Sequence, residues 1–299
     1  MNTKTQTVGA ALTLSLLTMG LQAQTTTNNQ SSPESIDTPA VTLEQKPVEA
    51  EGGLAAKLAN PVGSVYSVPI ETTWDFGAPN GEATFINVQP VIPISLNEDW
   101  NVINRTIIPF IDAPGGIEGR PGNPEPVQGP RTFGLGDISS SFFFSPANPG
   151  KVIWGAGPIL GFPTASDSVL GSGKFTAGPT AVVLTQPKPW TLGILTGNIW
   201  SYAGNDNRGS VNQMFFQYFV NYGLGDGWYL TSTPMMTANW NASSSERWTI
   251  PVGGGAGRLF QVGKLPIRTQ VQAFYNLDKP SGGADWSLMW TLQFVFPKK

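Results

Sequence analysis

Large apolar residues alternate with polar ones from Val65 onward, in segments of about ten residues. In the last segment the large apolar residues share one parity: Trp286, Leu288, Trp290, Leu292, Phe294 and Phe296. Ser287, Thr291 and Gln293 occupy the other parity. Successive side chains of a β-strand point to opposite faces, so this period of two predicts a strand with one apolar and one polar face.

The same alternation recurs along the chain between clusters of Gly, Pro, Asn and Asp. Ile70, Trp74 and Phe76, for example, alternate with Glu71 and Asp75. We count about twelve such segments. They lie at 65–77, 83–95, 100–111, 133–145, 152–163, 173–186, 190–202, 211–223, 228–239, 247–261, 265–277 and 285–296.

The connections between these segments alternate between longer and tighter ones. If the first strand runs outward from the periplasm, most longer connections lie outside the cell, as in bacterial outer-membrane barrels. An even number of strands lets the first and last strands pair, and this closure removes the sheet edges that a bilayer cannot tolerate. The sequence therefore predicts an all-β fold, a transmembrane antiparallel up-and-down β-barrel over residues 65–299.

The start of the chain has the layout of a signal peptide. Residues 1–7 carry Lys4 as their only charge, an apolar run follows over 8–21, and the small Ala23 suits a cleavage site. The apolar run, about 14 residues, is too short to cross roughly 30 Å of hydrocarbon. We therefore predict a signal peptide over residues 1–23 and localisation in the outer membrane of a Gram-negative cell.

Two short regions precede the barrel. Residues 24–53 are dominated by Thr, Asn, Gln, Ser, Pro and Glu, which predicts a disordered periplasmic tether. Residues 54–64 favour a short N-terminal helix that Pro61 stops. This segment either ends the tether or has a plug or rim role in the barrel.

The composition removes several classes of function. The net charge of -3 gives no basic surface for nucleic acid. Cys and His are both absent, which excludes disulfides, thiolate nucleophiles, imidazole bases and a lipoprotein anchor. We predict no enzyme activity, cofactor, catalytic residue or metal site. The expected partners are outer-membrane lipid, the barrel-assembly machinery and a small-molecule solute.

Polar residues on the wet parity of the strands are candidates for lining the lumen. Glu71 and Asp75 lie four residues apart on one face; such a pair could act as acid and base, but pore lining is the simpler account. Arg105 and Arg268 would give the lumen charges of both signs, which suits a neutral or zwitterionic solute. The full candidate set is Glu71, Asp75, Asn87, Gln89, Arg105, Gln217, Arg268, Gln270 and Gln272.

Two further patterns allow more than one interpretation. Aromatic residues near the segment ends, such as Trp100, Trp190 and Trp240, could stack on a ligand, but their spread along the chain favours an interfacial girdle. The glycine-rich run 253–257 could bind phosphate, but no Lys-Ser/Thr pair and no helix pattern follow it. We interpret it as a bend in a strand.

Several motifs carry a resemblance to a known family: NVQPVIPISLNEDWNVINRTIIPF, GLGDISSSFFFSP, WGAGPILGFPTASDSVLGSGKFTAGPT, NIWSYAGN and WTIPVGGGAG. From about residue 55 onward the chain resembles the outer-membrane proteins grouped as the MetA-pathway of phenol degradation family, which are described as transporters. The resemblance implies a membrane barrel, in some members linked to uptake of aromatic compounds, and carries over no site residues. One departure is that Phe296 is followed by Pro297, Lys298 and Lys299, whereas barrels commonly finish on an aromatic residue.

The leading functional hypothesis is a passive channel or facilitator for small solutes, hydrophobic or aromatic ones included. A closed structural or adhesive barrel is the alternative, because about twelve strands enclose a modest interior that side chains and the N-terminal helix could fill. An outer-membrane hydrolase is disfavoured because the usual catalytic His is absent. A secreted β-sandwich is opposed by the apolar outer face of nearly every strand.

Overall fold

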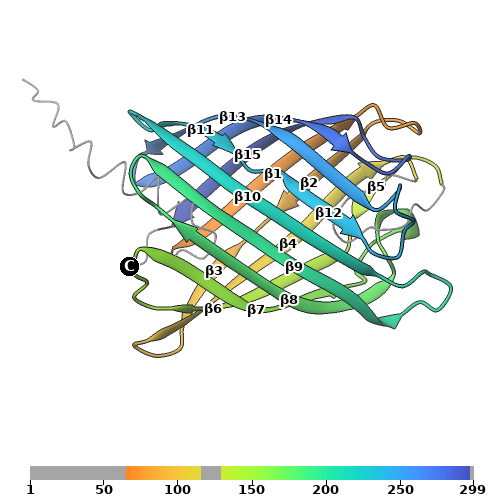
Figure 1. The fold of residues 1–299 in the computed structure, drawn as a ribbon, viewed down its shortest axis with the longest axis horizontal. Helices are drawn as coiled ribbons and strands as arrows, with labels where there is room; N and C mark the ends of the chain where they lie inside the picture. Colours follow the sequence, from red (N-terminus) through yellow and green to blue (C-terminus); the bar gives the residue numbers. More distant parts are fainter. Residues whose placement is uncertain (1–64, 116–128, 297–299) are drawn as a thin grey trace, which may run out of the picture. The chain divides into compact units, whose positions relative to one another are not determined.

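The computed structural model describes residues 65–115 and 129–296, so the predicted signal peptide, tether and helical segment 54–64 lie outside the described residues. The described part is one sheet of antiparallel strands that closes on itself (Figure 1). Its elements are β1 (Tyr66–Phe76), β2 (Ala83–Val88), β3 (Val91–Ser95), β4 (Trp100–Ala113), β5 (Thr132–Leu135), β6 (Ile138–Pro146), β7 (Val152–Phe162), η1 (Ser168–Leu170), β8 (Lys174–Thr185), β9 (Trp190–Gly204), β10 (Asn212–Gly225), β11 (Trp228–Ser232), β12 (Met235–Asn239), β13 (Trp248–Val262), β14 (Leu265–Asp278) and β15 (Trp286–Phe296).

Three passes of the chain across the sheet are each broken into two segments: β2 with β3, β5 with β6, and β11 with β12. The fifteen strand segments therefore make twelve passes, and the predicted twelve-strand antiparallel barrel is confirmed. Two of the breaks fall at Pro90 and Pro234. Proline has no N–H to donate to a ladder, so a pass that contains one is interrupted there.

The first and last passes close the barrel. β1 pairs with β15 over its whole length, from Tyr66 opposite Phe296 to Phe76 opposite Trp286. This closure leaves no sheet edge to face lipid, which membrane-spanning sheets require. No helix among the described residues is long and apolar enough to cross a membrane.

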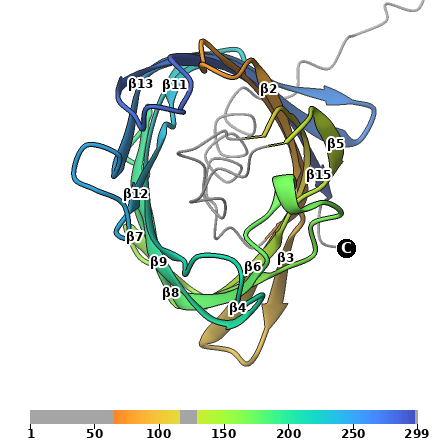
Figure 2. The same cartoon turned by 90° about the vertical axis from the view of Figure 1, so that its right-hand side faces the viewer.

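The two ends of the barrel differ in their connections. At one end, which we call the short-turn end, lie the segments 96–99, 147–151, 186–189, 226–227 and 263–264. At the other, the long-loop end, lie 77–82, 114–115, 129–131, 163–173, 205–211, 240–247 and 279–285. The long-loop end is on the right in Figure 1 and faces the viewer in Figure 2. This alternation is the one that the sequence predicts.

Side-chain exposure follows the predicted parity along most of β14. Val271 and Tyr275 are 48% and 58% exposed, whereas Gln270 and Gln272 are buried. Ile267, which the parity places on the lipid face, is also buried; it lies in register between Phe260 and Phe294. The outer surface is therefore apolar and the inner parity polar along most of this strand.

Aromatic rings pair near both ends of the barrel. Trp100 with Trp154 lies near the short-turn end, and Phe76 with Trp286 lies near the long-loop end. The remaining ring pairs are Trp190 with Tyr222, Phe175 with Tyr202, and Trp240 with Trp248. Most of these rings are exposed on the outer face, which favours the interfacial girdle over one ligand-stacking cluster.

Candidate solute-conducting lumen

The barrel encloses a cavity lined by side chains from most of the strands around the sheet. Among the candidate lumen residues, those that line this cavity are Glu71, Asp75, Asn87, Gln89, Arg105 and Gln217. Their side chains come from β1, β2, β4 and β10, and from Gln89 at the break after β2. Whether a solute contacts them stays a prediction.

One side of the cavity is polar and charged. Arg105 donates a hydrogen bond to the side-chain oxygen of Gln89, and Glu71 interacts electrostatically with the same guanidinium. Gln89 is fixed, since its backbone N–H donates to Pro69 O at 2.8 Å and only 4% of its surface is exposed. We call this side, with Glu71, Asn87, Gln89 and Arg105 on and between β1, β2 and β4, the charged wall.

The opposite side of the cavity carries a group of apolar residues, which we call the apolar wall. Ile159, Leu195, Ile199 and Phe215 line it from β7, β9 and β10, beside polar residues such as Thr180 and Gln217. The four apolar residues belong to a buried cluster that continues toward the short-turn end through residues such as Phe143. Figure 2 shows β9 across the lumen from β2. The lumen is therefore divided into a charged wall and an apolar wall.

The three candidate residues on β14 are held in a separate polar network. Arg268 Nε donates to the Tyr229 hydroxyl at 2.8 Å, and another guanidinium nitrogen donates to Gln270 Oε1 at 2.8 Å. The guanidinium also lies 4.9 Å from the centroid of the Tyr229 ring, within cation–π range. Gln272 Nε2 donates to Thr233 Oγ1 at 2.8 Å, and the Thr233 N–H donates back to Gln272 Oε1 at 3.0 Å.

This network is possible because the inward positions of the adjacent strand β13 are glycines there. Gly253, Gly255 and Gly257 of β13 lie opposite inward-facing residues of β14. A Cβ at Gly257 would overlap the Tyr229 ring. Side chains from β11 and β14 thus meet across these glycines of β13. We call this region, from β11 to β14, the stapled wall. The glycine run lies inside a continuous strand, where it leaves space for the side chains of β11 and β14.

The apolar wall and the contribution of Tyr229 could not be predicted from polarity alone. An apolar residue on the inner parity does not differ in kind from the residues that face lipid. A signal was present in Val182, Val183 and Leu184, where consecutive apolar residues predict a strand that is apolar on both faces. Tyr229 reaches β14 across another strand, and periodicity within one strand does not contain that information.

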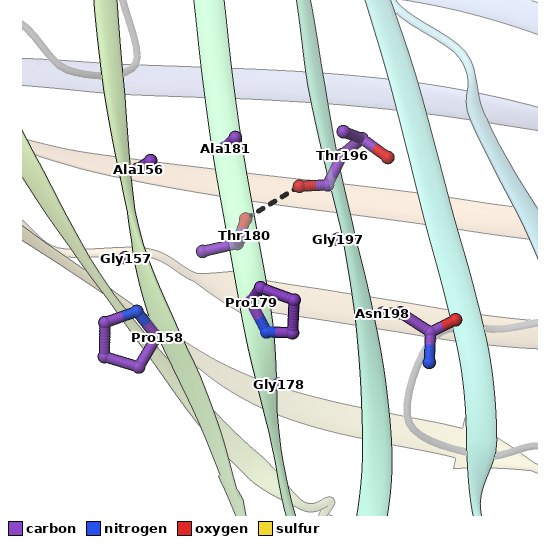
Figure 3. A pocket seen from close by; sticks show the side chains of 10 residues that line it. All are labelled: Ala156, Gly157, Pro158, Gly178, Pro179, Thr180, Ala181, Thr196, Gly197 and Asn198. Atoms are coloured by element: carbon purple, nitrogen blue, oxygen red, sulfur yellow. Dashed lines mark hydrogen bonds between the residues drawn. The ribbon is translucent and has the colours of Figure 1, made fainter.

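A second, shallower depression lies on the outer parity of β7, β8 and β9 (Figure 3). Pro158 and Pro179 face each other in register there, and Gly157, Gly178 and Gly197 surround them. Thr180 Oγ1 donates to Thr196 O at 3.0 Å across the strands. The depression carries no charged residue, so its chemistry is that of a lipid-facing surface.

Comparison with known proteins identifies the fold. No family model and no curated protein matches the sequence. Among solved structures, the chain is similar to the COG4313 outer membrane channel from Pseudomonas putida F1, with a TM-score of 0.56, 15% identity, and coverage of 78% of this chain and 96% of that one. It is less similar to the CymD monoaromatic hydrocarbon channel (TM-score 0.43, 8% identity, coverage 84% and 93%) and to LpxR from Salmonella typhimurium (0.41, 9%, 77% and 100%). The fold is that of an outer-membrane β-barrel, as the sequence predicts.

Proposed function

We propose that the protein is a passive channel or facilitator of the outer membrane for small solutes, including hydrophobic and aromatic ones. The observation that carries this proposal is the divided lumen. A cavity with Arg105 and Glu71 on one side and Ile159, Ile199 and Phe215 on the other can hold a solute with an apolar body and a polar group. The similarity to an outer membrane channel supports it, and so does the resemblance of several motifs to the MetA-pathway of phenol degradation family.

The charges in the cavity favour a neutral or zwitterionic solute. Glu71, Asp75 and Asp137 bring negative charge to the cavity, while Arg105 and Lys174 bring positive charge. A lumen in which both signs are present gives no strong field for either ion class. We therefore expect weak ion selectivity and measurable permeation of uncharged solutes.

Conductance of the purified protein in a planar bilayer tests the proposal. We expect discrete current steps in KCl, and swelling of proteoliposomes in isotonic arabinose. A barrel that inserts and shows its heat-modifiable gel shift, yet gives neither steps nor swelling, would contradict a channel.

The alternative is a closed structural or adhesive barrel, and one observation favours it. The interior of β3 to β10 holds a tightly buried apolar cluster in which Ile103 and Phe143 are each only 1% exposed. Side chains packed in this way reduce the space open to solute. The same bilayer measurement separates the two functions, because a closed barrel gives no current.

A further inference from the structure

The connection between β7 and β8 does not extend away from the barrel but packs on its inner side at the long-loop end. Leu170, at the end of η1, is 1% exposed and lines the cavity. Together with Val169 it packs in an apolar cluster with Phe85 of β2 and Ile111 of β4. These buried side chains therefore anchor segment 163–173 on the inner side of the barrel, at the mouth of the lumen.

Two glycines make the seat for this segment. A Cβ built at Gly134 would lie 3.0 Å from Leu170 Cδ1, and one at Gly136 would lie 3.2 Å from the Leu170 carbonyl oxygen. The backbone of the seat is bonded to the segment as well, since Ser166 N donates to Leu135 O at 2.9 Å and Leu135 N donates to Ser166 Oγ at 3.0 Å. The segment also bonds at the break between β5 and β6, where the Thr164 hydroxyl donates to Gly136 O at 3.0 Å and accepts from the Ile138 N–H at 2.9 Å.

One carboxylate holds both limbs of the segment. Asp137 accepts hydrogen bonds from the Ala165 N–H at 3.1 Å, from the Ser172 N–H at 2.7 Å and from the Ser172 hydroxyl at 2.8 Å. The two limbs, before and after η1, are thus tied to a single side chain at the start of β6. Hydrogen bonds to a charged acceptor are stronger than those between neutral groups.

Arg208 fastens the segment from the neighbouring connection, 205–211. Its guanidinium donates to Ser168 O at 2.8 Å and to Gly171 O at 2.7 Å. These carbonyl groups flank Leu170, so the forked guanidinium fixes the position of that side chain.

We infer that segment 163–173 is the entrance filter of the channel, with Leu170 as the side chain that anchors it and with Asp137 and Arg208 as the groups that hold it in place. The inference rests on the proposed function. A segment fixed on the inner side of the barrel narrows the path at the mouth, so large hydrated solutes pass less readily than small ones. The filter thus selects solutes by size.

Truncation of Leu170 tests the inference, because a segment that is anchored less firmly obstructs the mouth less. Leu170→Ala should raise the single-channel conductance in KCl by about twofold and should admit sucrose to proteoliposomes that exclude it with the unmodified protein. Leu192→Ala is the matched control, because Leu192 is 37% exposed on the outer face of β9 and should leave both measurements unchanged. The heat-modifiable gel shift of each variant reports that the barrel has formed.

A second test leaves Leu170 and its seat intact. Arg208→Ala removes the two hydrogen bonds to Ser168 O and Gly171 O, and it should raise the conductance as Leu170→Ala does.

The outcomes separate the filter from the channel. If the unmodified protein conducts and Leu170→Ala and Arg208→Ala both behave like Leu192→Ala, the filter is wrong and the proposed function stands. If the unmodified protein is silent but Leu170→Ala conducts, the segment closes the barrel instead of filtering solutes, and both the filter and the proposed function are overturned. If all variants are silent, the proposed function fails and the filter fails with it.

Discussion

The charged wall and the stapled wall carry the same kinds of residue on the same inward parity, but the contacts of these residues differ. Arg105 lines the cavity, with Gln89 and Glu71 beside it. Arg268 is held by the Tyr229 hydroxyl, by the Tyr229 ring and by Gln270. Parity places an arginine inside a barrel, but its neighbours decide whether it lines the cavity or supports the wall.

The difference comes from what lies on the strand between the partners. Under Tyr229 the inward positions of β13 are glycines, so side chains from β11 and β14 can lie flat and meet. On the charged wall every pass carries inward side chains, among them Asn87 and Ile107, which fill that space. A buried polar network whose members are all bonded stiffens a wall, whereas a cavity-facing group stays available to solute.

The largest effect should follow from placing a side chain at one of the inward glycines of β13. Gly257→Leu would place a side chain where the Tyr229 ring lies, so we expect destabilisation of about 1–3 kcal/mol or more and loss of the heat-modifiable band. Gly150→Leu is the control, because a Cβ at Gly150 meets nothing within 4 Å. Equal gel shifts for the two variants would show that the stapled wall tolerates side chains on β13.

The assignment of lipid-facing residues on β14 can be tested with arginine substitutions on that face. Val271→Arg should destabilise the barrel by about 2–4 kcal/mol if the residue lies near the bilayer midplane. Leu277→Arg, close to the long-loop end of the same strand, should cost about 0–1 kcal/mol, because the penalty falls toward the interface. Urea unfolding in detergent-free bilayers measures both; a harmless Val271→Arg would contradict the facing assigned to β14.

Charge reversal distinguishes the two arginines directly. Arg105→Glu should shift the reversal potential in a KCl gradient toward cations, because residue 105 lines the cavity. Arg268→Glu should give a smaller shift and a loss of stability of about 1–3 kcal/mol, since Tyr229 and Gln270 lose a charged partner. Equal shifts without loss of stability would mean that both walls face solute in the same way.

The smallest effect concerns a single hydroxyl. Tyr229→Phe keeps the ring and its cation–π contact but removes the hydrogen bond from Arg268, so we expect a loss of about 1 kcal/mol and an unchanged conductance. Thermal unfolding and bilayer recording on the same sample check this. A conductance change in this variant would indicate that Tyr229 belongs to the solute path.

The sequence alone could predict the fold because lipid imposes a regular pattern. The alternation of apolar and polar residues, as in Trp286 to Phe296, depends only on whether a position faces lipid or the interior of the barrel. It is therefore visible within one strand. The seat at Gly134, the carboxylate of Asp137 and the reach of Tyr229 depend instead on residues distant in sequence. Such contacts depend on the register between strands and on the path of a loop. Neither of these produces a periodic pattern in the sequence.

The pairing of β1 with β15 also governs the timing of assembly. Tyr66 meets Phe296 only after nearly the whole described chain has been made, so the contact that seals the barrel is among the most distant in sequence. Contacts of this kind form slowly, because a long loop of chain must first be brought together. Until they form, two open strand edges can bind other chains, and the unsealed protein depends on protection during its export.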